Sequence, residues 1–403
     1  MLWKYQMRYL PGSSLMFGCV ASFLLSSCTA GGAPPERTGE PREIPCAASG
    51  LQAYWRAKLT YRVANLQTAD LNNRVRCAGR LPSGEIVLLV GGWFRNHTHV
   101  PAQVIVLTEG AGGQLKETSA RDLPQDVDPD CAEWDSEGFF VAQFSALVIG
   151  PIEASGSGEI NVVRVPPIDT GEVLAIARSA RPQEYYALFA DLGRDSVTPQ
   201  EYRLKKFKAS SDEALQTTVL GPVLFDNAFS SSDIRGFIRR SGNTLWVFGP
   251  GGNAWTVDTL AGTATEQLSE RDWREGTDFA RHHSWDWALI CKTAIAGDYS
   301  SLWLMGPTKT RLHPFGLLHA TFGAVSANPV SHEIYIADRI SYDEMGLTCV
   351  SIERGTATCR PIGRPREVVL EDSEAVVSVV PVRASDVLVI TDRGRIWRVD
   401  LDQ

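Results

Sequence analysis

Hydrophobic positions after residue 51 occur in short runs that are apolar on both faces, without the 3.6-residue period of amphipathic helices. Such runs, bounded by glycine, proline, serine or aspartate, are typical of strands buried on both sides. The clearest helical candidate is 201–215, so the pattern predicts an almost purely β structure. The predicted strands lie within 85–92, 104–108, 144–151, 244–250, 301–307, 333–338 and 386–392.

The runs recur at similar intervals along the chain. Gly91 and Gly150, like Gly249 and Gly306, are about 60 residues apart, and the body divides into about seven units of about 50 residues. Repeated small antiparallel sheets without long helices resemble a β-propeller, whose blades pack face to face. The resemblance covers 51–403 and predicts an all-β propeller of seven blades. Six blades, or a pair of β-sandwiches, are the alternatives.

The last repeat carries an Asp392-Arg393-Gly394 turn followed by Trp397, as in many propeller blades. Ile390 stands where the sialidase-type repeat has Ser or Thr, so the sequence does not support a sialidase-like assignment. We expect the ring to close by pairing 59–64 with the last strand, which removes two exposed sheet edges.

The amino terminus has the features of an export signal. Lys4 and Arg8 precede an apolar stretch, 14–25, that is short for a membrane span. The following Leu25-Ser26-Ser27-Cys28 resembles the lipobox of bacterial lipoproteins. The resemblance implies a signal peptide over 1–27 and a lipid anchor on Cys28. An ordinary secretory signal cut nearby, or an uncleaved anchor, are the alternatives.

Residues 28–50 are rich in proline and glycine, which predicts a flexible tether between the anchor and the body. In bacterial lipoproteins an aspartate after the acylated cysteine commonly retains the protein at the inner membrane. Thr29 occupies that position here. The resemblance therefore implies an extracytoplasmic protein of the cell envelope, anchored by lipid to the outer membrane.

Composition narrows the range of partners. The net charge of −8 repels phosphate backbones, so we expect no nucleic-acid partner. With 44% hydrophobic and 21% charged residues, the chain as a whole is of globular composition.

Cysteine usage is consistent with export and disulfide bonding. The segment around Glu353-Arg354-Gly355 reads as a hairpin with a three-residue loop, which would place Cys349 opposite Cys359. Their expected separation suits a disulfide. The pairing of the remaining cysteines is open, with Cys46–Cys77 and Cys131–Cys291 as the pairs left over.

An acidic stretch provides the most suggestive ligand set. Asp126, Asp128, Asp130 and Glu137 have the oxygen-ligand spacing of an EF-hand calcium loop. Cys131 replaces the glycine that the loop requires at its sixth position. The sequence therefore offers calcium as a ligand without requiring any cofactor, and a solvated acidic loop is the alternative.

Two further groups combine aromatic, basic and imidazole side chains. His97 and His99 would share a face of an extended segment and could ligate a metal, and aromatic and histidine groups can line a sugar or peptide site. Polar loops and packing between blades are the alternatives. The candidate binding residues are Trp93, Arg95, His97, His99, His282, His283, Trp285 and Asp286.

Nucleophile elbows, zinc-protease motifs, phosphate loops and dinucleotide fingerprints are absent from the sequence. This lowers the expectation of enzymatic activity without removing it. We therefore expect a membrane-tethered propeller that binds or scaffolds a protein or glycan partner, including a component of envelope assembly. The alternative is a metal-dependent hydrolase or lyase with its site at the central channel.

Overall fold

The computed structural model describes 42–45, 54–64, 66, 73–95, 98–125, 127, 132–135, 137–142, 147–154, 159–164, 172–191, 201–209, 214–222, 237–249, 254–268, 286–290, 293–297, 302–305, 310–313, 322–328, 333–339, 345–353, 356–365, 370–371, 374–383 and 386–401. The chain divides into two compact units, Met1–Glu40 and Pro41–Gln403, and all described residues belong to the second.

These described residues form strands, with one short 3-10 turn, η1 (Ala111–Gly113), so the all-β prediction is confirmed. The helical candidate at 201–215 is wrong. The segment forms β15 (Glu201–Lys208) and the start of β16 (Ala214–Pro222), which pair antiparallel. Tyr202 and Leu204 are buried and Arg203 between them is not, which follows the two-residue period of a strand.

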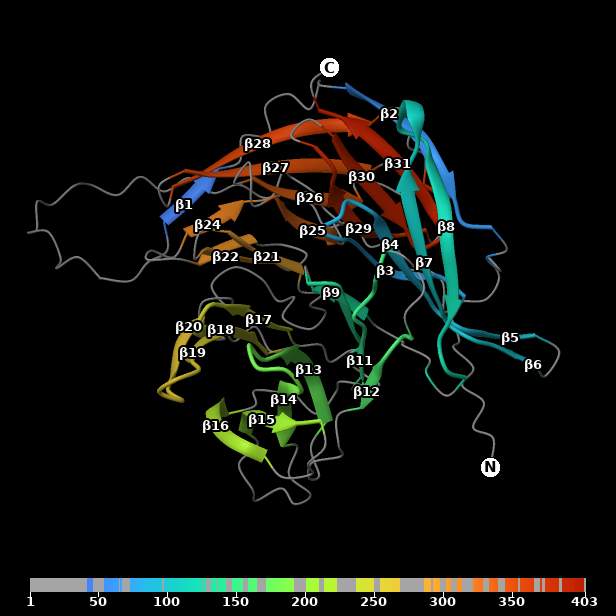
Figure 1. The fold of residues 1–403 in the computed structure, drawn as a ribbon. Coiled ribbons are helices and arrows are strands. Elements are labelled where there is room, and N and C mark those ends of the chain that lie inside the picture. Colours follow the sequence, from blue (N-terminus) through green and yellow to red (C-terminus); the bar gives the residue numbers. More distant parts are fainter. Residues whose placement is uncertain are drawn as a thin grey trace, which may run out of the picture. The chain divides into compact units, whose positions relative to one another are not determined.

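All the described strands except β1, β5 and β6 fall into seven antiparallel sets of four (Figure 1). Sheet 1 consists of β3 (Val75–Arg80), β4 (Ile86–Val90), β7 (Gln103–Glu109) and β8 (Leu115–Asp122), and sheet 2 of β9 (Ala132–Asp135), β10 (Phe139–Ala142), β11 (Leu147–Ile149) and β12 (Val162–Arg164). Sheet 3 consists of β13 (Glu172–Arg178), β14 (Glu184–Asp191), β15 and β16. Sheet 4 consists of β17 (Phe237–Ser241), β18 (Thr244–Phe248), β19 (Ala254–Asp258) and β20 (Ala264–Leu268).

Sheet 5 consists of β21 (Asp286–Ile290), β22 (Thr293–Gly297), β23 (Leu302–Met305) and β24 (Thr310–His313). Sheet 6 consists of β25 (Phe322–Asn328), β26 (Glu333–Arg339), β27 (Met345–Glu353) and β28 (Thr356–Pro365). Sheet 7 consists of β29 (Val376–Pro381), β30 (Asp386–Thr391), β31 (Arg395–Asp400) and β2 (Tyr54–Arg62). A two-residue parallel contact between β2 and β28 joins sheets 6 and 7. The grouping agrees with the predicted seven units, and the blade number of the whole chain stays a prediction.

The central strands are buried between neighbouring sheets, as the apolar runs predict. In β4, Leu88 packs in a cluster with sheet 7, and its neighbours Val87 and Leu89 pack in a cluster with sheet 2. In β30, Val389 faces sheet 6 and Leu388 faces sheet 1. Alternation along each strand therefore supplies one side chain to each of two interfaces.

The predicted closure is confirmed. β2 pairs antiparallel with β31, with Leu59 opposite Trp397 and Tyr61 opposite Ile396. The N–H of Val63 continues the pairing by donating to the carbonyl oxygen of Gly394 at 2.9 Å. The amino-terminal strand thereby completes the sheet that the end of the chain begins.

The structured body begins before the predicted boundary at residue 51. β1 (Arg42–Pro45) lies within the predicted tether, 28–50, and pairs parallel with β24. It extends sheet 5 to five strands. Part of the tether is therefore held as a strand at an outer sheet edge.

The predicted register of the cysteine hairpin is wrong. β27 pairs with β28 so that Glu353 faces Thr356, which leaves a two-residue link where we expected three residues. Cys349 consequently lies opposite Arg360, and Cys359 lies opposite Val350. This register removes the geometric argument for a Cys349–Cys359 disulfide, and the bond itself stays a prediction.

The other cysteine pairings are likewise untested. Cys77 is buried in β3, with its thiol 3.9 Å from the carbonyl oxygen of Ala78. Its expected partner Cys46, like Cys131 and Cys291, lies outside the described residues.

Candidate functional site

The direction of the strands defines two faces of the body. Because the four strands of each set alternate in direction, successive links alternate between the two ends of the sheet. The link between the second and third strands therefore lies at the same end as the link to the next sheet. Ala78 N donates to Ser378 Oγ at 2.9 Å, and Arg80 Nη1 donates to the carbonyl oxygen of Val382 at 2.8 Å. The first strands β3 and β29 therefore run in the same direction, and the repeat extends this arrangement to the other sheets. We call this end the loop face and the opposite end the turn face.

Nearly all long links join strand ends at the loop face. The links are 63–74, 91–102, 123–131, 165–171, 192–200, 223–236, 269–285, 314–321 and 366–375. The turn face has short links such as 136–138, 242–243 and 354–355, with 150–161 as its one long link between described strands. Long links on a rigid scaffold are where binding residues concentrate.

One group of predicted binding residues lies in a hairpin on the loop face. β5 (Trp93–Arg95) and β6 (Thr98–Val100) interrupt the link between β4 and β7. Trp93 lies opposite Val100, and His99 lies opposite Phe94. His97 lies outside the described residues, so the two-histidine metal site stays a prediction.

Asp286 is the one residue of the histidine–tryptophan group that the structure describes. It begins β21 at the loop-face end of sheet 5, where it lies opposite Gly297. His282, His283 and Trp285 lie outside the described residues, so the binding role of this group stays a prediction.

The structure describes one of the four predicted calcium ligands. Glu137 follows β9 at the turn face, and Asp126, Asp128 and Asp130 lie outside the described residues. Calcium binding by Asp126, Asp128, Asp130 and Glu137 therefore stays a prediction.

Glu137 takes part in an ion-pair network on the turn face. Its carboxylate accepts from Arg178 Nη2 at 2.7 Å and from Arg240 Nη2 at 3.0 Å. Arg178 Nε also donates to Asp135 Oδ2 at 2.8 Å, and its guanidinium stacks 3.4 Å from the ring centre of Phe139. This network connects sheets 2, 3 and 4.

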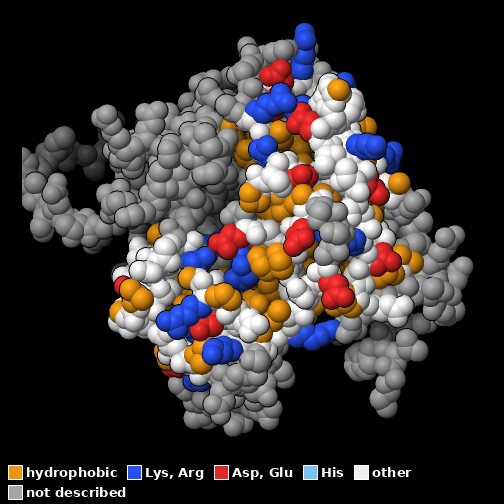
Figure 2. All heavy atoms as spheres, viewed as in Figure 1, with side chains coloured by type: hydrophobic (Ala, Val, Ile, Leu, Met, Phe, Trp, Pro, Cys, Tyr) orange, Lys and Arg blue, Asp and Glu red, His pale blue; other side chains and the backbone are white. Residues whose placement is uncertain are grey.

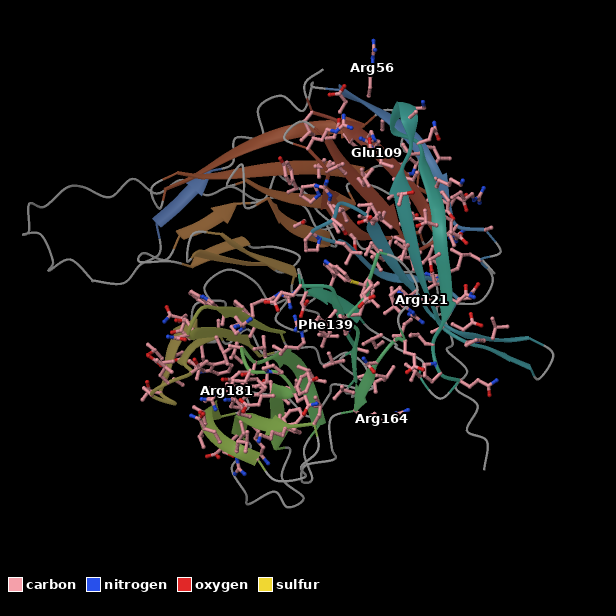
Figure 3. All side chains as sticks on the ribbon, in the orientation of Figure 1. Arg56, Glu109, Arg121, Phe139, Arg164 and Arg181 are labelled. Carbon is pink, nitrogen blue, oxygen red and sulfur yellow. The ribbon has the colours of Figure 1, made fainter. Side chains whose placement is uncertain are left out.

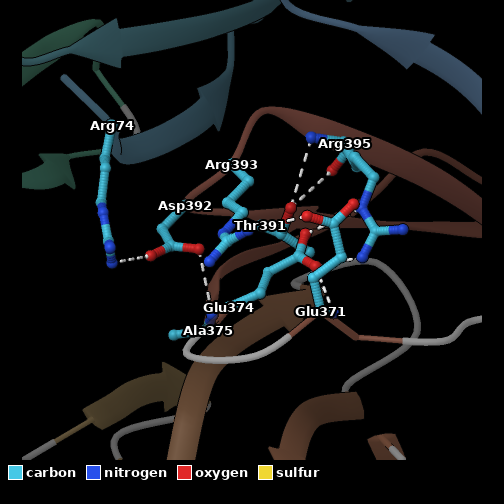
Figure 4. Close-up of polar contacts among 8 residues, drawn as sticks. All are labelled: Arg74, Glu371, Glu374, Ala375, Thr391, Asp392, Arg393 and Arg395. Carbon is cyan, nitrogen blue, oxygen red and sulfur yellow. Dashed lines mark hydrogen bonds and ion pairs between the residues drawn. The ribbon is translucent and has the colours of Figure 1, made fainter. Parts of the chain in front are cut away.

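A second network lies where sheet 7 meets sheet 1 on the loop face (Figure 4). Glu374 is fully buried, and its carboxylate pairs with Arg395 and accepts the N–H of Glu371 at 2.8 Å. Burial alone would raise the pKa of Glu374. The bonds from Arg395, Thr391 and Glu371 outweigh burial and hold the pKa below its ordinary value.

Asp392 continues this network into the neighbouring sheet. Its carboxylate accepts from Arg74 Nη1 at 2.5 Å and from the N–H of Ala375 at 3.0 Å. Burial raises the pKa of Asp392, although Ala375 and Arg74 both oppose that effect. Because Glu374 and Asp392 are buried, we interpret the network as a structural clamp across the closing seam.

The turn face of the same seam carries a third set of ion pairs. Glu109 Oε1 lies 3.0 Å from Arg383 Nη2 and 3.1 Å from Arg398 Nη2. Figure 3 labels Glu109 where the β7–β8 hairpin approaches β31. Tyr61 adds a bond from β2 to Glu117 at 2.9 Å, and burial together with this carboxylate raises the pKa of Tyr61.

Sequence reasoning missed these networks because their members come from different sheets. The Asp392-x-Gly394 turn was the one local signal, and it marked the hairpin without indicating Arg74 or Glu374. Within the described part of the chain, no three His, Cys, Asp or Glu side chains are grouped so as to hold a metal ion.

Comparisons with known proteins identify the fold. No protein-family model matches the chain, and no curated protein matches it by sequence. The β-propeller domain of Cps50 (Swd1) from Myceliophteria thermophila is 9% identical, with a TM-score of 0.50 over 85% of this chain and 99% of that one. The extracellular domain of a hybrid two-component system from B. thetaiotaomicron is 12% identical, with a TM-score of 0.50 over 86% of this chain and 43% of that one.

BamB from Moraxella catarrhalis is also similar, at 11% identity and a TM-score of 0.43 over 81% of this chain and 85% of that one. At this score the likeness carries no weight for function. Together with the repeated four-stranded sheets, the propeller domain of Cps50 establishes the fold class. The chain is an all-β protein with a β-propeller body.

Proposed function

We propose that this protein is a lipid-tethered, extracytoplasmic β-propeller that binds a protein or glycan partner through its loop face. The observation that carries the proposal is the placement of nearly all long links at that face. Of the candidate binding residues, those in β5 and β6 and Asp286 at the start of β21 lie at the same end of their sheets. The ion-pair networks and buried interfaces supply the rigid scaffold that such loops need.

The position of β1 supports an outward-pointing loop face. β24 is the fourth strand of its set and runs from the turn face to the loop face, and β1 runs parallel to it. Arg42 therefore lies at the turn-face end of β1. In the proposal, a chain anchored at Cys28 enters the body at this end and presents its loop face to the periplasm or the exterior.

The anchor and the surface need separate tests. Mass spectrometry of the purified protein should find an acylated Cys28 as its first residue, and Cys28→Ser should abolish the lipid. Among the described residues no helix is long and apolar enough to cross a membrane. A mature protein that starts elsewhere would contradict the anchor and leave the loop-face proposal standing.

Affinity capture from envelope extracts tests the surface. Trp93→Ala and Trp285→Ala should each reduce recovery of the same partner, and the turn-face variant Asn243→Ala should not. Glycan arrays would replace the extract if no protein is recovered. Equal recovery by all variants would contradict recognition through the loop face.

A further inference from the structure

β16 is an outer sheet edge without charged side chains. Its nine residues, Ala214–Pro222, contain no charged side chain. The outer strand of sheet 1, β8, by contrast carries Lys116, Glu117, Arg121 and Asp122. Charges on an edge strand discourage pairing with other chains, and an uncharged edge invites it.

Two of the three exposed side chains of this edge are apolar. Leu215 is 50% exposed and Val219 is 54% exposed, and Thr217 between them is exposed too. The other side of the strand is covered, since Thr218 Oγ1 donates to the carbonyl oxygen of Gly262 at 3.3 Å. Leu260, in the same turn as Gly262, is 80% exposed. Figure 2 shows hydrophobic side chains among lysines and arginines over the region where β16, β19 and β20 lie in Figure 1.

The backbone of β16 is paired on one side. Its partner in the sheet is β15, and no described strand follows it on the outside. Register shifts against β15 bracket a regular stretch, Gln216–Val219, that can accept a partner's backbone. This fold already adds a strand in such a place, because β24 receives β1 as a parallel fifth strand.

The charge of the neighbouring strand indicates what the partner carries. In β15, Arg203 lies opposite Val219 and Lys205 opposite Thr217. The strand has four basic residues and one acid (EYRLKKFK). Arg203 lies 3.4 Å from Glu201 and Lys206 lies 2.6 Å from Glu184, so the four basic residues still outnumber these two carboxylates. Acidic side chains on an added strand would be attracted to this edge, whereas basic ones would be repelled.

We propose that β16 receives an extended acidic segment of another protein, apolar at alternate positions, as a fifth strand of sheet 3. Main-chain hydrogen bonds to Gln216–Val219 supply the pairing, and Leu215 and Val219 supply the apolar contacts. This surface lies on the outer edge of the body and goes beyond the loop-face function, on which it does not depend.

Fluorescence anisotropy with the full chain tests the proposal. The probe is a labelled nonapeptide of alternating valine and glutamate, and it should bind at least tenfold more tightly than its valine–lysine counterpart. A valine–glutamate peptide with a central proline should not bind, because proline cannot complete a strand ladder. A photo-reactive version of the probe should label residues 214–222.

Variants locate the site. Val219→Glu and Leu215→Glu should each weaken binding of the valine–glutamate peptide at least tenfold. The thermal unfolding midpoints of both variants should equal that of the unmodified chain. The matched control is Ala120→Glu on β8, an exposed position on a charged edge, and it should bind as the unmodified chain does. Equal binding by the proline peptide, or by Val219→Glu, would overturn strand addition at β16. A dimer that forms without peptide and is lost in Val219→Glu would assign the edge to a second copy instead.

Discussion

The hydroxyl of Thr60 donates to the carbonyl oxygen of Ile396 at 3.0 Å, across 336 residues of the chain. Both residues are buried, in strands β2 and β31 of sheet 7. The bond shows how the propeller is closed: the last sheet is completed by a strand from the beginning of the chain. Integrity of the whole body should therefore depend on this seam.

Gly394 provides a test of the seam. Its φ is +73°, and a Cβ added there would lie 2.6 Å from Leu66 Cδ1 and 2.7 Å from Val63 Cβ. Gly394→Ala should lower the free energy of unfolding by about 2–4 kcal/mol, from backbone strain and overpacking together. Gly242→Ala is the matched control, because φ is +60° and nothing lies within 4 Å of the added carbon. Urea denaturation should show a loss of about 1 kcal/mol for the control. Equal losses would contradict tight packing at Gly394.

Glu374 should make stability depend on acid pH. The pKa of Glu374 in the folded protein is below the ordinary 4.5. Its ionised carboxylate therefore stabilises the fold fully above pH 4.5, and this stabilisation is lost as the pH falls through the folded pKa. Asp392 has the opposite effect on the pH dependence of stability. Its pKa is raised from 3.8, so protonation of Asp392 at acid pH favours the folded state. Glu374→Gln should lower the free energy of unfolding by about 3 kcal/mol at pH 7, because it leaves the half-buried Arg395 without its carboxylate.

The pH profile distinguishes this effect from a packing defect. The difference in unfolding free energy between the unmodified chain and Glu374→Gln should shrink below pH 4.5. Urea denaturation at pH 7, 5 and 3 measures it. A difference that stays constant with pH would show that the charge of Glu374 does not stabilise the clamp.

Gly79 should tolerate no side chain. A Cβ there would lie 2.1 Å from the indole of Trp134, which packs directly against β3 from sheet 2. Gly79→Ala should destabilise the fold by about 1–3 kcal/mol through overpacking. Trp134→Ala should cost about 3–5 kcal/mol alone, yet the double variant should be no worse than Trp134→Ala. Additive losses in thermal unfolding would contradict the contact.

Arg178 should contribute more to the free energy of unfolding than an exposed arginine nearby. It bonds to Asp135 and Glu137 in sheet 2 and stacks on Phe139, with 18% of its side chain exposed. Arg178→Ala should cost about 1–2 kcal/mol in urea denaturation. Arg181→Ala, whose side chain is 77% exposed, should change stability by less than about 0.5 kcal/mol. A similar effect of both changes would count against the network.

The strands could be predicted from the sequence because the signal is local. Runs such as Ile86–Val90 and 245–248 are apolar at every position, and each lies in a central strand here. Closure by the segment around Leu59 was predictable for a related reason, since a ring of sheets leaves no other partner for the last strand. The error at 201–215 arose where lysines in β15 concealed the alternation of Tyr202 and Leu204.

The site was harder to predict because it depends on register and on contacts between sheets. One residue in the length of a hairpin loop decided whether Cys349 faced Cys359. The calcium spacing did not predict that a strand, β9, lies between Asp130 and Glu137. No spacing rule relates Arg74 to Asp392, or Arg178 to Glu137, because folding alone brings them together.

Site-specific photo-crosslinking in cells tests the central claim, recognition through the loop face, most directly. A photo-reactive amino acid would replace Phe94 or Asp286 on the loop face, and Asn243 or Arg181 on the turn face. The account predicts that both loop-face positions crosslink to the same envelope partner and that neither turn-face position does. Crosslinks to that partner from the turn face alone would contradict it.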